Sequence, residues 1–418
     1  MTDSGAVGSE RSAGMVVVGG GLAAGKAVET LRAEGYRGQI TAISDEPFAP
    51  YERPPLSKSY LLGTSDLDDV FVHDEAWYRD NEVDLRTGLS VTSVDLDSRF
   101  VVAGGQRVPF DKLLLATGSR VRTLTVPGAD LAGIHYLRRI PDAQKLRDAL
   151  AGGGRSVTVV GAGWIGLETA AAARTYGNEV TVVEPEPVPL NRVLGPQMGE
   201  VFGALHRDHG VKFRLGDGVS AFSGSAGRVS GVTTSSGAQL DADVVIVGVG
   251  ISPAVELAQA AGLEVDNGIL TDASLRTSHP DVFAAGDVAR SFNPVLGRAV
   301  RVEHWANALD GGPVAARGML GQEATHDRVP YFFSDQYDLG MEYAGLAGPG
   351  DYDEVVVRGD IESREFIAFW TKEQRLLAGM NVNVWDVTDQ IQALIRSGHA
   401  IDPTRLADVD VPLESLVP

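Results

Sequence analysis

The chain contains no cysteine, and this absence narrows the chemistry that its 418 residues can perform. Without a thiol there is no disulfide, no thiolate-bound metal and no cysteine-ligated iron–sulfur cluster. A redox dithiol is excluded for the same reason. Any electron transfer by this protein therefore requires a carrier that is not part of the polypeptide.

Long apolar runs and basic residues are also scarce. No apolar run approaches the roughly 18 residues that a membrane span needs, so we expect no contact with the membrane interior. The formal net charge is −20, which argues against nucleic acid as a partner because phosphate recognition needs a basic surface. Residues 1–14 lack the basic start and apolar core of a signal peptide. We therefore predict a disordered tail over 1–14 on a cytoplasmic protein.

A strand, a glycine-rich turn and a helix follow one another near the middle of the chain. The β-branched run that begins at Val157 leads into a G-x-G-x-x-G pattern, and an alanine-rich helix is predicted over Leu167–Thr175. The glycines of the pattern are Gly161, Gly163 and Gly166. Gly161 closes the turn, Gly163 lets the backbone approach a pyrophosphate, and Gly166 lets the helix pack closely on the strand. The helix N-terminus offers free N–H groups to phosphate, so the sequence predicts a dinucleotide site here.

An acidic residue follows the next predicted strand, Glu179–Val183. Glu184 stands where a carboxylate can accept a hydrogen bond from a ribose 2′-hydroxyl and repel a 2′-phosphate. This position favours NADH over NADPH. A solvated or helix-capping acid is the alternative interpretation.

A second glycine pattern lies near the N-terminus. The short strand Met15–Val18 leads into a G-x-G-x-x-A pattern made by Gly19, Gly21 and Ala24. A helix is predicted over Leu22–Glu34, and Gly35 ends it. The next strand, Gln39–Ser44, ends at Asp45 and Glu46, of which Glu46 is the favoured partner for an adenosine ribose. The sequence therefore predicts two dinucleotide sites.

A proline-rich segment follows the first of these sites. Pro54 and Pro55 fix an extended backbone that holds Arg53 on one side and Lys58 on the other. Two cations on a rigid segment beside a phosphate-binding turn suggest contact with the ligand. A proline-stiffened surface loop with solvated charges is the alternative.

Three further strand ends carry residues suited to a cofactor. The strand Lys112–Ala116 ends in small residues that let backbone pass over a ligand, and Asp243–Val249 closes on Gly250. The strand Val282–Ala285 leads into Gly286 and Asp287, which puts a carboxylate at the mouth of a cofactor site. After Val329 the sequence becomes rich in aromatic residues and in alternating patterns, which predicts a separate β-rich domain.

The order of these motifs resembles that of the FAD-dependent ferredoxin reductases of bacterial oxygenase systems. The motifs that carry the resemblance are Gly19–Ala23, Arg53–Lys58, Leu115–Gly118, Gly161–Glu168, Ala285–Asp287 and Ser334–Tyr337. The resemblance implies an α/β fold class, with two interleaved Rossmann-like domains of the glutathione-reductase type and a C-terminal α+β domain. The expected divisions are a tail at 1–14, an FAD-binding domain at 15–121 and 247–326, an NAD-binding domain at 122–246 and a C-terminal domain at 327–418.

The resemblance also implies FAD at the first glycine pattern and NADH at the second. Along FAD we expect Gly19, Gly21, Leu22, Ala23, Ala24, Asp45, Glu46, Arg53, Lys58, Ala116, Thr117, Gly118, Arg120, Gly286, Asp287 and Trp305. Along NADH we expect Gly161, Gly163, Trp164, Ile165, Gly166, Glu168, Glu184, Arg192, Gly248, Val249 and Gly250. Lys58 and Glu168 would form the catalytic pair beside the reactive flavin nitrogen. No metal site is expected, because the histidines show no ligand spacing beside carboxylates.

The implied function is transfer of hydride from NADH to FAD and of single electrons to an iron–sulfur ferredoxin of the two-iron two-sulfur type. That ferredoxin would feed an oxygenase such as a cytochrome P450. The absence of cysteine removes the relatives that need a redox thiol. A rubredoxin acceptor, a simple NADH-dependent monooxygenase and an NADH-responsive binding protein resembling apoptosis-inducing factor remain as alternatives.

Two further expectations concern association. We expect a monomer or a weak dimer. Arg298 and Arg301 precede the predicted helix at Trp305, and we expect them to steer an acidic ferredoxin toward the flavin edge.

Overall fold

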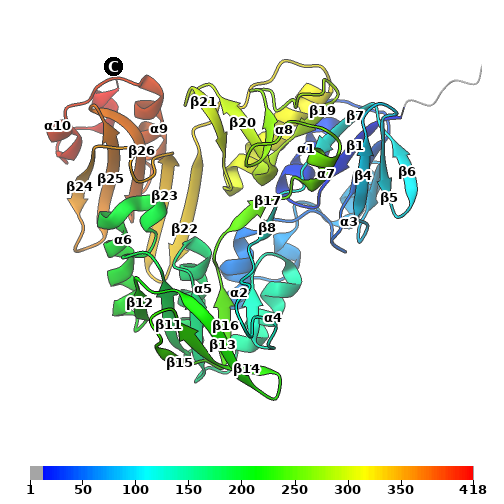
Figure 1. Ribbon diagram of the computed structural model, residues 1–418. Coiled ribbons are helices and arrows are strands. Elements are labelled where there is room, and N and C mark those ends of the chain that lie inside the picture. The colour runs from blue at the N-terminus through cyan, green and yellow to red at the C-terminus, as the bar shows by residue number, and fades with distance from the viewer. Residues whose placement is uncertain (1–12, 418) are drawn as a thin grey trace, which may run out of the picture.

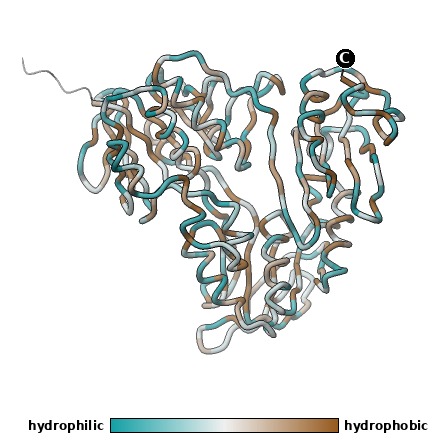
Figure 2. The backbone as a smooth tube through the Cα atoms, turned by 180° about the vertical axis from the view of Figure 1, so that it is seen from behind, coloured by the Kyte–Doolittle hydropathy of each residue, from teal (hydrophilic) through white to brown (hydrophobic). Residues whose placement is uncertain are grey.

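The computed structural model describes residues 13–417, so the predicted tail lies outside the described residues except for 13–14. Three lobes are arranged around a central junction (Figure 1). Each lobe contains hydrophobic stretches of its own (Figure 2), and the buried apolar side chains form several clusters instead of one. This agrees with a chain too long for a single core.

The first lobe is built on a five-stranded parallel sheet in the order β19-β7-β1-β2-β3. Its strands are β1 (Met15–Val18), β2 (Ile40–Ile43), β3 (Val83–Arg86), β7 (Lys112–Leu115) and β19 (Val282–Ala284). β1 is buried along its whole length, as expected for a parallel sheet covered on both faces. Because β19 comes from much later in the chain, two separate sequence segments make this sheet.

Two different layers cover the first sheet. Met15 and Val17 face a core formed with α1 (Leu22–Ala33) and α8 (Trp305–Met319), which pack against each other. Val16 and Val18 face the opposite core, to which a small antiparallel sheet contributes valines. The strands of that sheet are β4 (Val91–Asp95), β5 (Phe100–Ala103) and β6 (Gln106–Pro109).

The second lobe repeats the parallel plan in the order β12-β11-β10-β16-β9. Its strands are β9 (Ile134–Tyr136), β10 (Ser156–Val160), β11 (Glu179–Glu184), β12 (Lys212–Leu215) and β16 (Val244–Val247). The helices are α4 (Ile140–Leu150), α5 (Trp164–Thr175) and α6 (Asn191–Asp208). An antiparallel sheet of β13 (Val219–Ser225), β14 (Arg228–Thr234) and β15 (Gln239–Asp241) shares an apolar core with β10 and β16.

A pair of short antiparallel strands joins the first two lobes. The chain leaves the first lobe through β8 (Ser119–Val121) and returns through β17 (Ile251–Pro253), and the two strands pair residue for residue. Both crossings therefore run side by side between the two parallel sheets (Figure 1).

The third lobe is an antiparallel sheet in the order β22-β23-β26-β25-β24. Its elements are β22 (Tyr331–Gln336), β23 (Leu339–Gly345), β24 (Glu354–Asp360), β25 (Glu365–Lys372), β26 (Arg375–Val382), α9 (Thr388–Ser397), α10 (Pro403–Ala407) and η4 (Leu413–Leu416). One face packs on α9, and the other shares a core with the second lobe through residues such as Trp370 and Phe202. The C-terminal lobe is thus fixed to the α5–α6 side of the second lobe.

The remaining elements line the junction or lie on the surface of the first lobe. They are η1 (Pro54–Ser57), α2 (Ser59–Leu62), η2 (Asp68–Val70), α3 (Glu75–Asp80), α7 (Glu256–Ala260), β18 (Ile269–Thr271), η3 (Gly286–Val288), β20 (Ala289–Asn293) and β21 (Arg298–Arg301). β18, β20 and β21 form a three-stranded sheet that the sequence patterns did not predict. Within residues 13–417, every helix is too short or too polar to cross a bilayer.

The expected fold class is confirmed, although some element bounds differ. The helix predicted from Leu167 begins three residues earlier, at Trp164, directly after the second glycine of the pattern. α6 begins at Asn191, and Gly195 inside it has a non-helical backbone with φ of 78°. Glycine permits that bend because it has no Cβ to clash at positive φ.

Candidate functional site

The first glycine turn leaves open space where a pyrophosphate is expected. A Cβ on Gly19 would lie 2.1 Å from the carbonyl oxygen of Ala116, so only glycine fits this close strand contact. At Gly21, by contrast, a Cβ would meet no atom within 4 Å. Gly21 is the N-cap of α1, and no side chain caps the helix there. The first turn of α1, with the buried Leu22, Ala23 and Ala24, is therefore free to present its N–H groups to an anion.

The second glycine turn has the same construction. A Cβ on Gly161 would lie 2.4 Å from the Gly248 carbonyl oxygen, and one on Gly166 would lie 2.1 Å from the Gly161 carbonyl oxygen. Gly163, the N-cap of α5, again faces open space and receives no side-chain cap. Val249 and Gly250, which has φ of 98°, continue from Gly248 along the same edge. In both turns, therefore, the first glycine packs tightly against a neighbouring strand end, and the N-cap glycine borders open space.

Acidic residues stand at the ends of the strands that follow each turn. Glu184 accepts a hydrogen bond of 2.6 Å from the backbone N–H of Ala162, inside the second glycine turn. A second bond of 3.0 Å from the N–H of Glu186 fixes the carboxylate there. Arg192 is ion-paired to Glu186 at 2.6 Å and is otherwise exposed. The carboxylate of Glu184 is therefore held at the place where a ribose would meet the turn.

Asp45 and Glu46 have different partners in the structure, and these do not favour Glu46 as the ribose ligand, as the sequence did. Glu46, the preferred ribose ligand, is buried and accepts hydrogen bonds from the Tyr51 hydroxyl at 2.7 Å and from Arg53 at 3.2 Å. Asp45 is half exposed and pairs with Arg139 at 2.6 Å. Burial lowers the pKa of Arg53, but Tyr51, Glu46 and Asp287 outweigh it and raise that pKa overall. Glu46 therefore holds Arg53, and Asp45 has the freer carboxylate.

Asp287 lies in a second buried cluster at the edge of the first lobe. Arg138 donates to the Asp287 carboxylate at 2.8 Å and to the Ser119 carbonyl oxygen at 3.1 Å. Gly286, with φ of 77°, packs on the start of α1. Arg138 was not among the predicted site residues, because a lone arginine before a helix carries no distinctive spacing. It joins the second lobe to the predicted flavin site.

Polar groups without partners mark the same region. Among the described side chains, Ser119 Oγ and His304 Nδ1 are buried and have no hydrogen-bond partner. Burial lowers the pKa of His304 to about 4, against the opposing effect of Asp287. Nearby, Thr117 Oγ1 donates to the Ala254 carbonyl oxygen at 2.8 Å, and Gly118 has φ of 65°. Buried orphan atoms beside a conformationally special backbone fit a polar ligand that completes the site.

Trp305 and Arg120 occupy opposite kinds of environment. The Trp305 indole N–H donates to Glu52 at 2.9 Å, and its ring lies 6.2 Å from that of Phe333. Arg120 is mostly exposed on β8 and lies 3.6 Å from Glu256. The structure therefore keeps Trp305 near the lobe junction and turns Arg120 toward solvent.

The steering role expected for Arg301 is wrong. Its side chain is largely buried, pairs with Glu303 at 2.5 Å and donates to the Asp287 carbonyl oxygen at 3.3 Å. Only Arg298, at the start of β21, is exposed. Periodicity could not show this, because β20 and β21 were not predicted as strands.

Lys58 and Glu168 meet where the three lobes join. The Lys58 ammonium lies 2.7 Å from Glu168 Oε1, and Lys58 also lies 5.6 Å from the ring centre of Phe333. Ser57 and Ser334 donate to the same carboxylate, the latter at 2.7 Å. Burial and the nearby Glu168 charge raise the pKa of Asp335, while Lys58 opposes them. One buried carboxylate therefore orients a cation at the junction.

The two NADH-side apolar residues are placed unequally. Ile165 is one of the few large apolar side chains that are exposed, directly after the open glycine position. Trp164 instead packs edge-on against Phe202 and Phe332 in the shared core. Ile165 is thus available to a ligand, and Trp164 is chiefly a packing residue.

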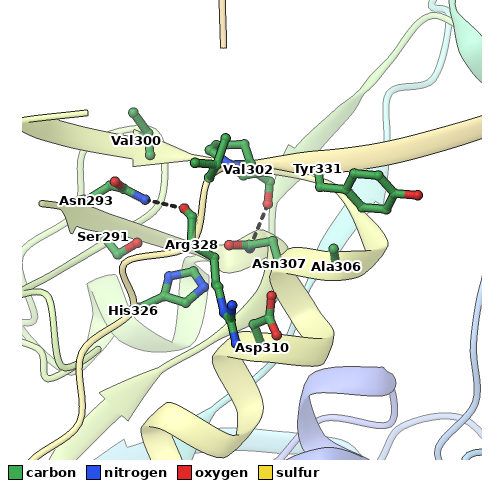
Figure 3. A pocket seen from close by; sticks show the side chains of 12 residues that line it. Ser291, Asn293, Val300, Val302, Ala306, Asn307, Asp310, His326, Arg328 and Tyr331 are labelled. Atoms are coloured by element: carbon green, nitrogen blue, oxygen red, sulfur yellow. Dashed lines mark hydrogen bonds between the residues drawn. The ribbon is translucent and has the colours of Figure 1, made fainter. Parts of the chain in front are cut away.

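A small cavity of about 20 Å³ lies between β20, β21, α8 and the segment that leads to β22 (Figure 3). This volume suits a single water molecule and is far too small for a nucleotide. His326 lines it with both ring nitrogens unpartnered, and burial lowers the pKa of that histidine. No predicted cofactor residue lines this cavity, and the described residues contain no cluster of His, Asp and Glu suited to a metal ion.

Comparisons with known families assign most of the chain. Residues 14–312 match the family described as pyridine nucleotide-disulphide oxidoreductase, and residues 331–417 match the family described as reductase C-terminal. The first match ends inside α8, and the second begins at β22, the first strand of the third lobe.

Individual relatives match over nearly the whole length. The chain is 39% identical over 403 residues to rhodocoxin reductase of Rhodococcus erythropolis, covering 96% of this chain and 93% of that protein. It is 42% identical over 404 residues to the ferredoxin–NAD(+) reductase component of the anthranilate 1,2-dioxygenase system of Burkholderia cepacia, covering 96% and 98%. Among solved structures, the covalent putidaredoxin reductase–putidaredoxin complex matches with a TM-score of 0.93 at 35% identity, covering 97% and 98%.

Proposed function

The chain belongs to the pyridine nucleotide-disulphide oxidoreductase family, and we propose that it is an NADH-dependent flavoprotein reductase of a ferredoxin. It takes hydride from NADH onto FAD and passes single electrons to an iron–sulfur ferredoxin that feeds an oxygenase. The observation that carries this proposal is the pair of open glycine turns on separate lobes, with the Lys58–Glu168 pair at their junction. The cysteine-free sequence excludes the disulfide chemistry of the family name.

Bound FAD supplies the chemistry that the polypeptide lacks, since a flavin accepts an electron pair and can release electrons singly. The residues of the chain bind and orient the two nucleotides. The first turn of α1, with Arg53 and Asp287, holds FAD, and the first turn of α5, with Glu184, holds NADH. The Lys58 ammonium would stabilise negative charge on a bound flavin, and Glu168 holds that ammonium in place.

The electron acceptor is argued from the relatives and from the missing thiol. One relative described above is named as the ferredoxin reductase component of a dioxygenase system, and a similar reductase is solved in covalent complex with putidaredoxin. Because the chain holds no redox-active side-chain pair of its own, the acceptor is external. We propose the domain division 15–121 with 247–326 for FAD, 122–246 for NADH and 327–418 for the C-terminal lobe. It is supported by the three main sheets. NADH as reductant argues for a cytoplasmic location.

The visible spectrum of the purified protein is the first test. We expect a yellow protein whose flavin absorbance bleaches when NADH is added without oxygen, with much less bleaching at the same concentration of NADPH. Added two-iron two-sulfur ferredoxin should then support rapid NADH-driven reduction of cytochrome c. A colourless protein that cannot be reconstituted with FAD would contradict the proposal. A rate of cytochrome c reduction that is the same with and without added ferredoxin would also contradict it.

A further inference from the structure

A chain of buried hydrogen bonds leads from Glu168 on α5 of the second lobe through β22 of the third lobe and back to α6 of the second. Ser334 on β22 lies 2.7 Å from Glu168 Oε1, and Gln336 Nε2 lies 3.1 Å from Ser334 Oγ. His206 on α6 then meets Gln336 Oε1 at 2.8 Å. Glu168, Ser334, Gln336 and His206 are all buried, so water does not compete for these bonds.

The ionised carboxylate fixes the direction of every bond in this chain. A carboxylate only accepts, so the Ser334 hydroxyl proton must point to Glu168. Ser334 can then only accept from Gln336, which directs the amide N–H₂ toward the serine and the amide oxygen toward His206. That oxygen requires a proton on Nε2 of His206. All three donors therefore point toward Glu168.

The surroundings of His206 agree with this assignment. Burial lowers its pKa to about 4, with the hydrogen bond to Gln336 opposing and the nearby His209 reinforcing the shift. A neutral imidazole protonated at Nε2 leaves Nδ1 as an acceptor, and the Tyr337 hydroxyl lies 3.4 Å from it. Tyr337 stacks on His209 with ring centres 3.7 Å apart, and Arg174 is the nearby cation that acts on Tyr337. The described neighbours thus supply a donor at Nδ1 and an acceptor at Nε2.

We propose that Ser334, Gln336 and His206 are positioning residues for the Lys58–Glu168 pair. Their one-directional chain stabilises the charged carboxylate, and the carboxylate holds the Lys58 ammonium toward the flavin site. The second and third lobes thereby tune how readily the flavin accepts hydride, although none of the three residues is placed among the cofactor ligands. This inference rests on the function proposed above, since it concerns the same ion pair.

The state of His206 gives a test that needs no turnover. In protein labelled with ¹⁵N-histidine, we expect His206 to show the neutral form protonated at Nε2 at pH 7, with its signal assigned by His206→Gln. Ser334→Ala removes the acceptor of the Gln336 amide, so the amide can turn over and a mixture of tautomers should appear. The proposal would be overturned if His206 showed the Nδ1–H form in the unaltered protein, or if its signal were unchanged in Ser334→Ala.

The flavin potential and the reduction rate provide the second test. We expect Ser334→Ala to slow NADH-driven flavin reduction about tenfold at saturating NADH, with the KM for NADH unchanged. The midpoint potential of the bound flavin should fall by about 30 mV, the two-electron equivalent of tenfold. Ser334→Thr keeps the hydroxyl and should restore both. An unchanged potential and rate in Ser334→Ala would overturn the positioning role.

Thr371→Val provides the matched control. Thr371 lies on β25 of the same sheet, is equally buried, and its hydroxyl has no hydrogen-bond partner among the described residues. Losing this hydroxyl should alter neither the His206 tautomer nor the potential. If Thr371→Val produces the mixture of His206 tautomers and the lower flavin potential expected for Ser334→Ala, the effect is general to the sheet and the proposal fails. Absence of FAD binding in the unaltered protein would instead contradict the proposed function, because the tautomer is measured on the polypeptide itself.

Discussion

Lys58 and Glu168 differ in what surrounds them, and the difference suggests their division of labour. Glu168 is almost completely buried and receives three donors, whereas Lys58 keeps 17% of its side chain exposed. A buried carboxylate is tolerated only when it is fully hydrogen-bonded and paired. Glu168 is therefore the fixed member of the pair, and Lys58 is the member that can reach a ligand.

Replacing Lys58 by Met should lower the rate of flavin reduction by NADH about 100-fold, the usual cost of losing one charge-stabilising donor. Stopped-flow absorbance at the flavin band measures this rate. Because the single change leaves Glu168 unpaired, unfolding in urea should also show a loss of about 3 kcal/mol. The double variant with Glu168→Gln should recover stability without recovering the rate. Unchanged flavin reduction in Lys58→Met would reject the catalytic role.

Glu184 carries the nucleotide preference at the same scale. Glu184→Gln keeps an oxygen for the N–H of Ala162 and removes only the negative charge. The ratio of kcat/KM for NADPH to that for NADH should rise about tenfold, because the repulsion of a 2′-phosphate is lost. Glu186→Gln, two residues further on, is the control and should leave the ratio within about twofold. An unaltered ratio in Glu184→Gln would show that another group reads the ribose.

At the scale of elements, the two glycine turns share one design. In each, a Cβ on the first glycine would clash with a backbone oxygen, whereas a Cβ on the N-cap glycine would meet no atom within 4 Å. The sequence pattern predicted this division of roles, and the helices begin at the predicted turns. The same strand, turn and helix therefore recur on two lobes with different neighbours.

The glycines of the second turn should respond oppositely to alanine. Gly163→Ala adds a methyl group in open space, so the protein should fold with unchanged stability while NADH binding weakens at least tenfold. Gly166→Ala forces a Cβ to within 2.1 Å of the Gly161 carbonyl oxygen and should cost about 1–3 kcal/mol of stability or more. Urea unfolding and NADH titration distinguish the two effects. Equal stability losses would contradict the design.

The sequence predicted those elements whose geometry is local. The glycine turns follow from spacing, and the resemblance to a known family implied the parallel plan of the first two lobes. Partners distant in sequence did not follow from it. Arg138 meets Asp287 across 149 residues, and Glu46 is occupied by Tyr51 and Arg53. Such pairings depend on tertiary packing, and the residues around one position in the sequence do not predict them.

At the scale of the whole molecule, buried neutral histidines link stability to pH. The pKa values of His206 and His304 fall to about 4 in the folded protein, mainly through burial. The unfolded chain protonates them near pH 6.5, so below that pH it binds more protons than the folded one. Their stabilising contribution is complete above pH 6.5 and is lost as the pH falls toward 4.

Unfolding free energy at fixed FAD concentration should therefore fall by several kcal/mol between pH 7 and pH 4.5, which urea titrations can measure. His206→Gln removes one of the histidines whose pKa is lowered by burial and should flatten this dependence by about a third. His399→Gln, at an exposed position after α9, should leave the curve unchanged. A curve with the same slope in His206→Gln would contradict the assignment.

The paired strands β8 and β17 have a consequence for how this polypeptide can be cut and rejoined. Val121 lies directly opposite Ile251, so the two ends of the intervening segment are neighbours in space. The whole of 122–250 is therefore an insertion whose exit and entry points a turn of two or three residues could bridge. Excising it would yield a shortened, contiguous flavoprotein gene, and new termini could equally be opened at this seam.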